Sequence, residues 1–239
     1  MNLKSFTYII MLAIALVSCN VNTVIGSGVV ITESRPITEF SEVYIQGDYI
    51  LHFKQGNNYK LFLKMDDNLL DNTITEINGD ELRIISNSNV LKSTAKDIYI
   101  TVKKLDRIKL VGSIVLINPS VFTVNSLKII SEGVSDLDLH IYSNRLSLNL
   151  SGSSNVKLIG VSGNLDVEMS GYGNLNSLGL FCNNVALELS GAVSSKVFSK
   201  NYLDVDISGA GQVYYKGTPK LNIETSRNGM VLPIKNISK

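Results

Sequence analysis

The sequence predicts an all-β protein with a β-solenoid in its C-terminal part and a hairpin-rich N-terminal part continuous with it. An alternating apolar strand followed by Ser-Gly occurs four times, at spacings of 19, 20 and 18 residues. A fixed period of about 20 residues with strand alternation is typical of stacked β-repeats. In addition, residues 29–107 contain short alternating runs and no helical period. The four pairs are Ser151-Gly152, Ser170-Gly171, Ser190-Gly191 and Ser208-Gly209.

The first 28 residues are predicted to target and anchor the chain. Lys4 precedes the apolar stretch Phe6 to Val17, which is too short to span a bilayer. The stretch leads into Leu16-Val17-Ser18-Cys19, which resembles the bacterial lipobox, whose cysteine is lipidated and becomes the new N-terminus. We therefore interpret residues 1–18 as a lipoprotein signal peptide and residues 19–28 as a lipid-anchored tether. The alternative is an ordinary secretory signal with a chance cysteine.

Lipidation at Cys19 would make the membrane a partner of this chain. Several acyl chains on one residue anchor a protein stably, since each buried CH₂ contributes about 0.8 kcal/mol. We expect export and anchoring in the bacterial envelope, at the outer membrane, facing the periplasm or the cell surface. The tether has no acidic run after Cys19, which favours the periplasmic side.

Composition argues against a nucleic-acid partner and against stabilisation by disulfide bonds. The chain has 239 residues, with 22 basic and 21 acidic side chains and a net charge of +1. It lacks the basic excess of a nucleic-acid-binding protein. Only Cys182 remains once Cys19 is lipidated, so no intramolecular disulfide is expected. Cys182 lies near a predicted corner with no histidine close in sequence, which indicates a buried or half-buried structural thiol.

Residues 29–107 are expected to form strands and hairpins as the first part of a single domain, residues 29–239. The run from Val43 to Phe53 alternates around a turn, and Asp66 to Leu70 is expected to form a bend. Asn78-Gly79 between alternating strands is a strong hairpin signal, which favours a type I′ turn.

Residues 108–239 are expected to form the repeated coils. The first, third and fifth residues of a coil are apolar and are predicted to point inward, as in Leu165, Val167 and Met169, while Gly171 and Gly209 form corners. A β-sandwich with regular hairpins is the alternative, and the near-constant period argues against it. The predicted strand starts are Ile108, Leu127, Leu146, Leu165, Val185, Leu203 and Leu221.

Counting back from the corner serines predicts a stack of acidic side chains on one outer face. Its members are Asp166, Glu168, Glu188, Asp204, Asp206 and Glu224. Charges in strands usually form a solvated outer face. The functional alternative is a surface for a cation or a basic partner. Oxygen ligands suit Ca²⁺, so Ca²⁺ is the one cofactor that the sequence suggests.

Four tyrosines near predicted corners, Tyr172, Tyr202, Tyr214 and Tyr215, could stack on sugars, although packing at the rim of the core is the simpler interpretation. A nucleophile–base pair is hard to assemble, because His52 and His140 are the only histidines and neither lies in a recognisable motif. The sequence therefore offers no catalytic residues.

The layout of the mature chain resembles the bacterial family described as putative auto-transporter adhesin, head GIN domain. The ordered features that carry the resemblance are Gly26-Ser27-Gly28, Arg35-Pro36 before Phe40, Val43 to Gly47, Gln55-Gly56, Asp67 to Leu70, the Asn78-Gly79 turn before Leu82 to Ile84, and the Ser-Gly coils. The resemblance implies a right-handed parallel β-helix in envelope proteins that are often lipoproteins. No catalytic residues come with it.

These observations favour a non-enzymatic envelope lipoprotein that acts as an adhesin, a ligand-binding module or a scaffold, with an unknown envelope, surface or glycan partner. The alternative is a carbohydrate-active enzyme of the polysaccharide lyase type, since such enzymes also use β-helices. However, a lyase needs cations near its anionic substrate, and the acidic face lacks regular basic neighbours. A third hypothesis is a structural role in which the sides or ends of the rod pair as a homo-oligomer.

Overall fold

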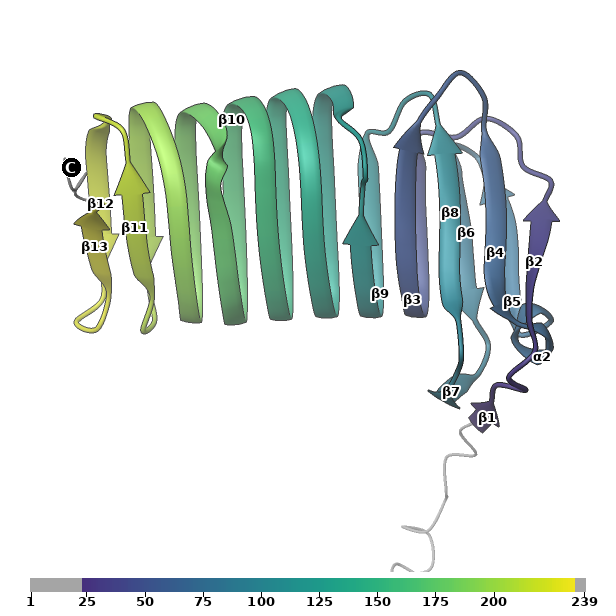
Figure 1. Ribbon diagram of the computed structural model, residues 1–239. Helices are drawn as coiled ribbons and strands as arrows, with labels where there is room; N and C mark the ends of the chain where they lie inside the picture. The colour runs from purple at the N-terminus through teal and green to yellow at the C-terminus, as the bar shows by residue number, and fades with distance from the viewer. Residues whose placement is uncertain (1–22, 235–239) are drawn as a thin grey trace, which may run out of the picture.

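Within the part of the chain that the computed structural model describes, residues 23–234, the protein is all-β apart from one single-turn helix (Figure 1). The fold class expected from the sequence is confirmed at this level. The expected signal peptide (residues 1–18), Cys19 and the first residues of the tether lie outside the described residues. The elements are β1 (Thr23–Ile25), β2 (Val30–Arg35), β3 (Glu42–Gln55), β4 (Lys60–Asp66), α2 (Asp67–Leu70), β5 (Thr73–Asn78), β6 (Glu81–Ser86), β7 (Asn89–Lys92), β8 (Lys96–Val102), β9 (Arg107–Ile117), β10 (Phe122–Ile207), β11 (Gln212–Lys216), β12 (Lys220–Thr225) and β13 (Met230–Pro233).

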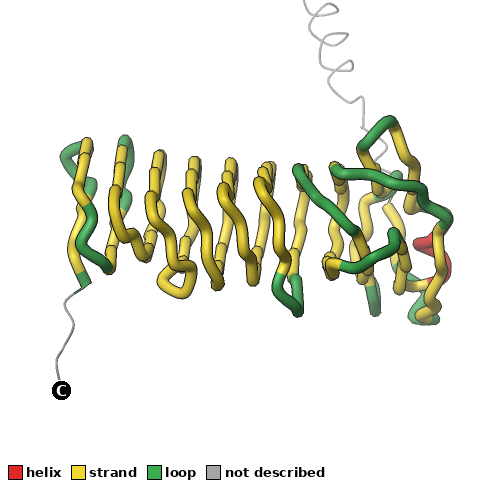
Figure 2. The backbone as a smooth tube through the Cα atoms, turned by 90° about the horizontal axis from the view of Figure 1, so that it is seen from above, coloured by secondary structure: helices red, strands yellow, loops and turns green. Residues whose placement is uncertain are grey.

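Strand β10 forms most of the body, and its 86 residues wind repeatedly about the long axis of the molecule (Figures 1 and 2). Strand β9 pairs with β10 in parallel over eleven positions, from Arg107↔Lys128 to Ile117↔Asp138. Strands β11 and β12 pair in parallel with the last part of β10. The first three Ser-Gly corners do not interrupt β10, whereas the fourth, Ser208-Gly209, directly follows its end at Ile207.

The corner glycines lie above one another in a column along the stack. The members of this glycine column are Gly47, Gly112, Gly133, Gly152, Gly171, Gly191 and Gly209. A Cβ on Gly152 would lie 2.2 Å from the carbonyl oxygen of Gly133, and one on Gly171 would lie 2.3 Å from that of Gly152. Successive coils therefore approach too closely at this corner for any side chain. The four Ser-Gly pairs of the sequence are the C-terminal part of this longer column.

The core follows the alternation predicted from the repeat. Leu165, Val167 and Met169 are 0%, 3% and 2% exposed, and their equivalents in the next-to-last coil are equally buried. Cys182 is also buried, at 2% exposed, as expected for a structural thiol. Side chains from successive coils fill the interior. One apolar cavity of about 20 Å³ lies between Phe53, Leu105 and Phe122, with room for about one water molecule.

Coil stacking begins earlier than the expected division near residue 107. Strand β3 pairs in parallel with β9 over eleven positions, from Glu42↔Arg107 to His52↔Ile117, and its other edge pairs with β6 and β8. Strands β8, β4 and β2 then follow in antiparallel pairing, and β5 and β6 form an antiparallel hairpin. The N-terminal end of the stack is therefore built from both kinds of ladder.

Two local expectations in this part are corrected. The hairpin loop is Gly79-Asp80, because Asn78 pairs with Glu81. Of the two loop residues, Gly79 has positive φ, at 60°, and Asp80 does not. Glycine at the first central position fits a type II′ turn, whereas type I′ needs positive φ at both central residues. The expected bend is the single-turn helix α2, whose Leu69 and Leu70 are buried.

The residue before this helix connects the N-terminal segments. Asp66 is fully buried and does not cap α2; instead, its carboxylate accepts the backbone N–H groups of Thr94 at 3.0 Å and Ala95 at 3.3 Å. Buried carboxylates need such donors, because burial of an unpaired charge is costly. Asp66 thus fixes the segment before β8 to the end of β4.

No helix within residues 23–234 has the length and apolarity required to cross a membrane.

Candidate binding face of the coils

One outer face of the stack carries most of the aligned charged side chains, and we call it the charged face. It consists of the outward residues of β6, of the first half of β3 and β9, of the equivalent segments of β10, and of β12. The register places Arg83 beside Tyr44 and Tyr44 beside Lys109. It also places Glu42 beside Arg107, which lies beside Lys128. Side chains far apart in sequence therefore form rows along the stack.

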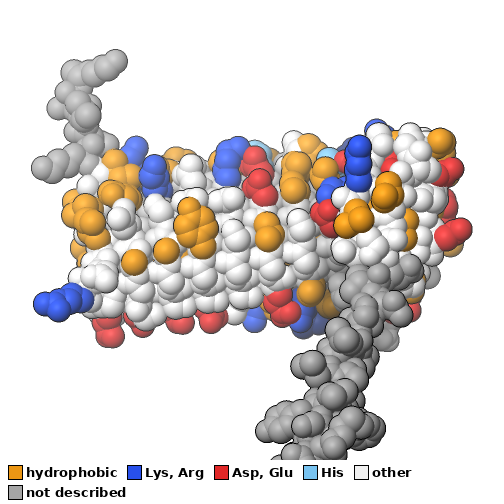
Figure 3. All heavy atoms as spheres, turned by 90° about the horizontal axis from the view of Figure 1, so that it is seen from below, with side chains coloured by type: hydrophobic (Ala, Val, Ile, Leu, Met, Phe, Trp, Pro, Cys, Tyr) orange, Lys and Arg blue, Asp and Glu red, His pale blue; other side chains and the backbone are white. Residues whose placement is uncertain are grey.

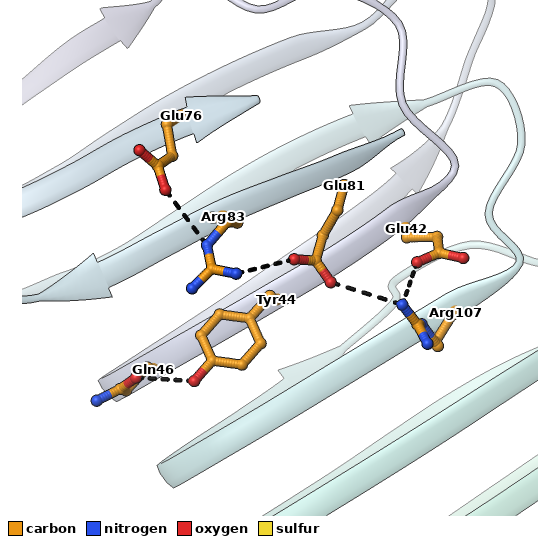
Figure 4. Close-up of polar contacts among 7 residues, drawn as sticks. All are labelled: Glu42, Tyr44, Gln46, Glu76, Glu81, Arg83 and Arg107. Carbon is orange, nitrogen blue, oxygen red and sulfur yellow. Dashed lines mark hydrogen bonds and ion pairs between the residues drawn. The ribbon is translucent and has the colours of Figure 1, made fainter. Parts of the chain in front are cut away.

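The N-terminal half of the charged face holds a network of ion pairs (Figure 4). Arg83 contacts Glu76 and Glu81, each at 3.3 Å. Arg107 contacts Glu81 at 3.7 Å and also pairs with Glu42. Acidic and basic groups compensate one another here, and exposed pairs of this kind contribute about 0–1 kcal/mol each.

An aromatic ring supports the same network. The Arg83 guanidinium lies 4.6 Å from the centre of the Tyr44 ring, and the Tyr44 hydroxyl donates to the Gln46 side chain at 2.8 Å (Figure 4). A cation over a ring is stabilised by about 0.5–1 kcal/mol at an exposed site. These contacts connect β5, β6, β3 and β9 across their outer surface.

The C-terminal half of the charged face is acidic. Asp204 lies beside Asn222 and Asp206 beside Glu224 in the β10–β12 register. We call the six carboxylates Asp166, Glu168, Glu188, Asp204, Asp206 and Glu224 the acidic row. Figure 3 shows acidic side chains following one another along one edge of the coiled part.

Half of the acidic row has local partners and half has none. Asp166 lies 3.4 Å from Arg145, Glu168 accepts a 2.8 Å hydrogen bond from Asn149, and Asp204 accepts one of 2.9 Å from Asn222. Within residues 23–234, the carboxylates of Glu188, Asp206 and Glu224 form no ion pair or side-chain hydrogen bond. Their negative charge is therefore available to a ligand.

A groove lies over part of the acidic row, but the described carboxylates form no cluster that could bind a metal ion. The groove is lined by residues that include Arg145, Asn149, Asp166, Glu168 and Glu188. Among the described residues, no group of three or more His, Cys, Asp or Glu side chains is placed to hold a metal ion. The carboxylates follow one another along the stack instead of converging on one point.

The four tyrosines do not form one platform. Tyr172 and Tyr202 are 66% and 56% exposed at different corners. Tyr214 and Tyr215 lie within β11, beside Lys196 and Val197, and Tyr215 packs against the core. No ring contact joins any two of these four side chains in the described chain. A sugar-stacking surface would have to use one of these rings at a time.

The nucleophilic and basic groups are placed for packing. His52 lies in β3, 2.7 Å from an Asp97 carboxylate oxygen, and its ring stacks on Tyr99 with centroids 4.5 Å apart. Burial raises the pKa of the Cys182 thiol to about 12, partly opposed by a hydrogen bond from the Ser162 backbone. At neutral pH this thiol is protonated, so it is not a nucleophile.

Two features of the outer surface are not apparent from the sequence. One is the network of Glu76, Arg83, Glu81, Arg107 and Glu42. The other is a group of exposed apolar side chains on another face, which includes Tyr142, Val161 and Phe181 at 46%, 41% and 57% exposed. Outward positions in alternating strands could have indicated both, but only the register shows which of them meet.

The geometry defines a class of protein: an all-β body of parallel, in-register segments that displays rows of side chains on its outer faces. The chain belongs to the family described as "Putative auto-transporter adhesin, head GIN domain", whose model matches residues 39–219. The resemblance inferred from the ordered motifs is therefore confirmed. No match was found among curated proteins.

Solved structures show the same fold. A crystal structure of a putative adhesin from Bacteroides fragilis has a TM-score of 0.83 at 20% identity, covering 88% of this chain and 100% of that one. A protein from Parabacteroides distasonis, described as a putative lipid binding protein, has a TM-score of 0.70 at 21% identity over 90% of this chain and 100% of that one. A putative adhesin from Parabacteroides merdae has a TM-score of 0.65 at 21% identity, with coverage of 90% and 100%.

Proposed function

We propose that this protein is a non-enzymatic, lipid-anchored envelope protein that binds a basic partner through its acidic row, as an adhesin or a scaffolding module. Its body is a right-handed parallel β-helix, and its anchor at Cys19 holds it at the outer membrane. Three things support the proposal: the adhesin description of its family, the parallel register of the coils, and the lipobox-like segment that precedes the fold.

The observation that carries the proposal is the unpaired half of the acidic row. Adjacent strands lie about 4.8 Å apart, and like charges facing each other at that distance destabilise a sheet by about 0.2–1 kcal/mol per pair. Asp206 and Glu224 are such a pair. A partner with regularly spaced positive charges relieves this repulsion when it binds, and such binding weakens with salt.

A basic macromolecule fits the row better than Ca²⁺ does. Ca²⁺ takes six to eight oxygen ligands around one centre. The row spreads its carboxylates along several coils, and the described residues contain no metal-binding group of three. An extended partner can contact many coils at once.

The row also disfavours the lyase alternative. A polysaccharide lyase must stabilise negative charge that develops on an already anionic substrate, which requires cations at the site. The acidic row would repel such a substrate. Steady release of unsaturated products from a panel of acidic polysaccharides would overturn the non-enzymatic assignment.

One structural relative is described as a putative lipid binding protein. We do not propose that this chain binds an acyl chain in its interior. The apolar cavity of about 20 Å³ holds about one water molecule. The lipid contact that we propose for this chain is instead covalent and lies at Cys19.

Neutralising the acidic row is expected to weaken binding of poly-lysine. We expect the triple variant Glu188→Gln, Asp206→Asn, Glu224→Gln to lose at least tenfold in affinity at low salt, because three exposed charge contacts of about 0.5–1 kcal/mol each are lost. Biolayer interferometry with residues 20–239, which contain the whole described fold, measures this.

The matched control removes three exposed carboxylates elsewhere: Asp71→Asn, Asp80→Asn and Asp136→Asn. It changes net charge equally, so we expect it to lose less than threefold. Equal losses in both triple variants would mean that poly-lysine senses net charge and not the acidic row, which contradicts the proposal.

Replacing Cys19 by serine is expected to release the protein from membranes. In the native envelope host, the unaltered chain should sediment with the membrane fraction and incorporate labelled palmitate, and Cys19→Ser should do neither. Cys182→Ser is the control, because it removes the other cysteine and leaves the lipidation site intact. Membrane association of Cys19→Ser without a label-bearing lipid would contradict anchoring at this residue.

A further inference from the structure

The C-terminal end of the stack leaves positions of the core uncovered. In the β10–β12 register, Leu221 stacks on Leu203 and Ile223 stacks on Val205. Leu203 and Val205 are each 1% exposed, whereas Leu221 and Ile223 are 40% and 41% exposed. These two side chains therefore occupy core positions whose far side is open. An apolar end of this kind is a site for association.

The backbone at this end is open as well. Among the described residues, β12 pairs with β10 alone and β13 with β11 alone. The N–H of Ser226 donates to the carbonyl of Ile207, so even-numbered residues of β12 turn their backbone groups toward β10. By alternation, Leu221, Ile223 and Thr225 turn theirs away from the stack. An edge with free donors and acceptors is a template for another strand.

The N-terminal end is built differently. There, β2 and β4 pair in antiparallel fashion, and the helix α2 lies at this end (Figures 1 and 2). Its Leu69 and Leu70 are each 4% exposed. The edge strand β2 also leaves one side chain partly uncovered there, because Ile31, opposite the buried Met65, is 44% exposed. Self-association that joins two copies of the same C-terminal end is isologous, so it closes as a pair and does not continue into a fibre.

We propose that this end binds a second copy of the chain, with the two β12 strands antiparallel about a two-fold axis at Asn222. In this arrangement Leu221 lies opposite Ile223 of the second copy, and the two residues exchange both backbone hydrogen bonds. The two cores become continuous. Lys220 lies opposite Glu224 of the second copy, so each dimer gains two ion pairs on its outer surface. In the dimer, Glu188 and Asp206 remain the unpaired carboxylates of the acidic row.

The charges select this register. The backbone N–H and C=O groups of β12 alternate in direction. A shift of the pairing must therefore keep Leu221 and Ile223 opposite residues whose backbone groups also point toward the second copy. The next register would place Lys220 opposite Ser226 and Asn222 opposite Glu224, so it forms no ion pair. The shift in the other direction places Lys220 opposite Asn222. The register centred on Asn222 is the one that satisfies both charges.

The dimer also sets the position of the anchors. Figure 1 shows that β1, with which the described chain begins, lies toward the N-terminal end of the stack, away from β12 and β13. A dimer joined at the C-terminal ends therefore carries its two β1 strands toward its two far ends. Two such chains, each anchored near its N-terminus, would meet tip to tip.

Sedimentation velocity of residues 20–239 from 1 to 100 μM tests the proposal. We expect the mass of a dimer at the upper concentrations. Lys220→Glu alone and Glu224→Lys alone each place like charges opposite each other twice per dimer, so each should weaken dimerisation about tenfold. Mixing the two variants places opposite charges at both pairs of the mixed dimer, so association should return.

Restoration on mixing separates loss of the interface from misfolding, because a misfolded variant would not recover. Lys54→Glu makes the same charge change in β3 and should leave dimerisation unaltered. A monomer at every concentration, larger open assemblies, or a dimer unaffected by Lys220→Glu would each overturn the proposal.

Discussion

Gly152→Ala is expected to lower the free energy of unfolding by about 3 kcal/mol or more. Gly152 has φ of +102°, where a residue with a Cβ is strained by about 1–3 kcal/mol. The added Cβ would also lie 2.2 Å from the Gly133 carbonyl oxygen. Gly133 in turn lies equally close to the coil before it, since a Cβ added to Gly133 would lie 2.3 Å from the Gly112 carbonyl oxygen. Strain and steric overlap therefore add.

Gly28→Ala separates these two effects. Gly28 also has positive φ, at 84°, but no atom lies within 4 Å of an added Cβ. We expect this variant to lose only the conformational part, about 1–2 kcal/mol. Urea denaturation followed by circular dichroism measures both variants. Equal losses would show that close approach of the coils at the glycine column does not contribute to stability.

The Cys182 thiol is expected to react at least about 1000-fold more slowly in the folded protein than in the unfolded chain. Burial raises its pKa from 9.0 to about 12, a difference of three units, so the thiolate fraction at pH 8 falls by about 10³. Residues 20–239 contain no other cysteine. Labelling with a disulfide reagent at pH 8, with and without urea, measures the ratio.

The same shift makes stability depend on pH. Above pH 9 the thiol ionises in the unfolded chain and stays protonated in the folded one until about pH 12. The unfolded state then binds fewer protons, so stability falls as pH rises through this range. Cys182→Ser should reduce that fall. Rapid labelling of the folded protein, or an unchanged pH slope in the serine variant, would contradict burial of the thiol.

The sequence predicts the repeated part of the fold well, because its information there is local and periodic. The inward positions of Leu165, Val167 and Met169 follow from alternation within one coil, and the Ser-Gly pairs follow from the corner. Gly112 and Gly133 belong to the same column, but they follow Val111 and Glu132 and not serine. The motif therefore underestimates the length of the column.

The N-terminal part is less predictable, because its strands pair in both parallel and antiparallel orientation and at irregular spacings in the sequence. Strand β3 pairs in parallel with β6, β8 and β9, and none of these is its neighbour in sequence. The Asn78-Gly79 pair shows how local signals mislead by one residue. The hairpin forms as expected, but its loop is Gly79-Asp80, which changes the turn type.

The candidate site also has a part that the sequence predicts and a part that it does not. The acidic row could be counted from the repeat, since its members recur at the coil period. The ion pairs of Arg83 and Arg107 could not, because they depend on pairing between β5, β6, β3 and β9. Nor could the sequence show that Glu168 has an amide donor while Glu188 has none, since that depends on a neighbouring coil.

The glycine column also constrains how the length of such a protein can change. Each coil from β3 to the end of β10 contributes one glycine, and each glycine after Gly47 lies closely against the one before it. Gain or loss of one whole coil of 18–21 residues leaves every remaining neighbour in place, whereas an insertion of a few residues within a coil displaces a side chain into the column. Related chains should therefore differ in length by whole coils, or by loops that leave the stack at its other corners.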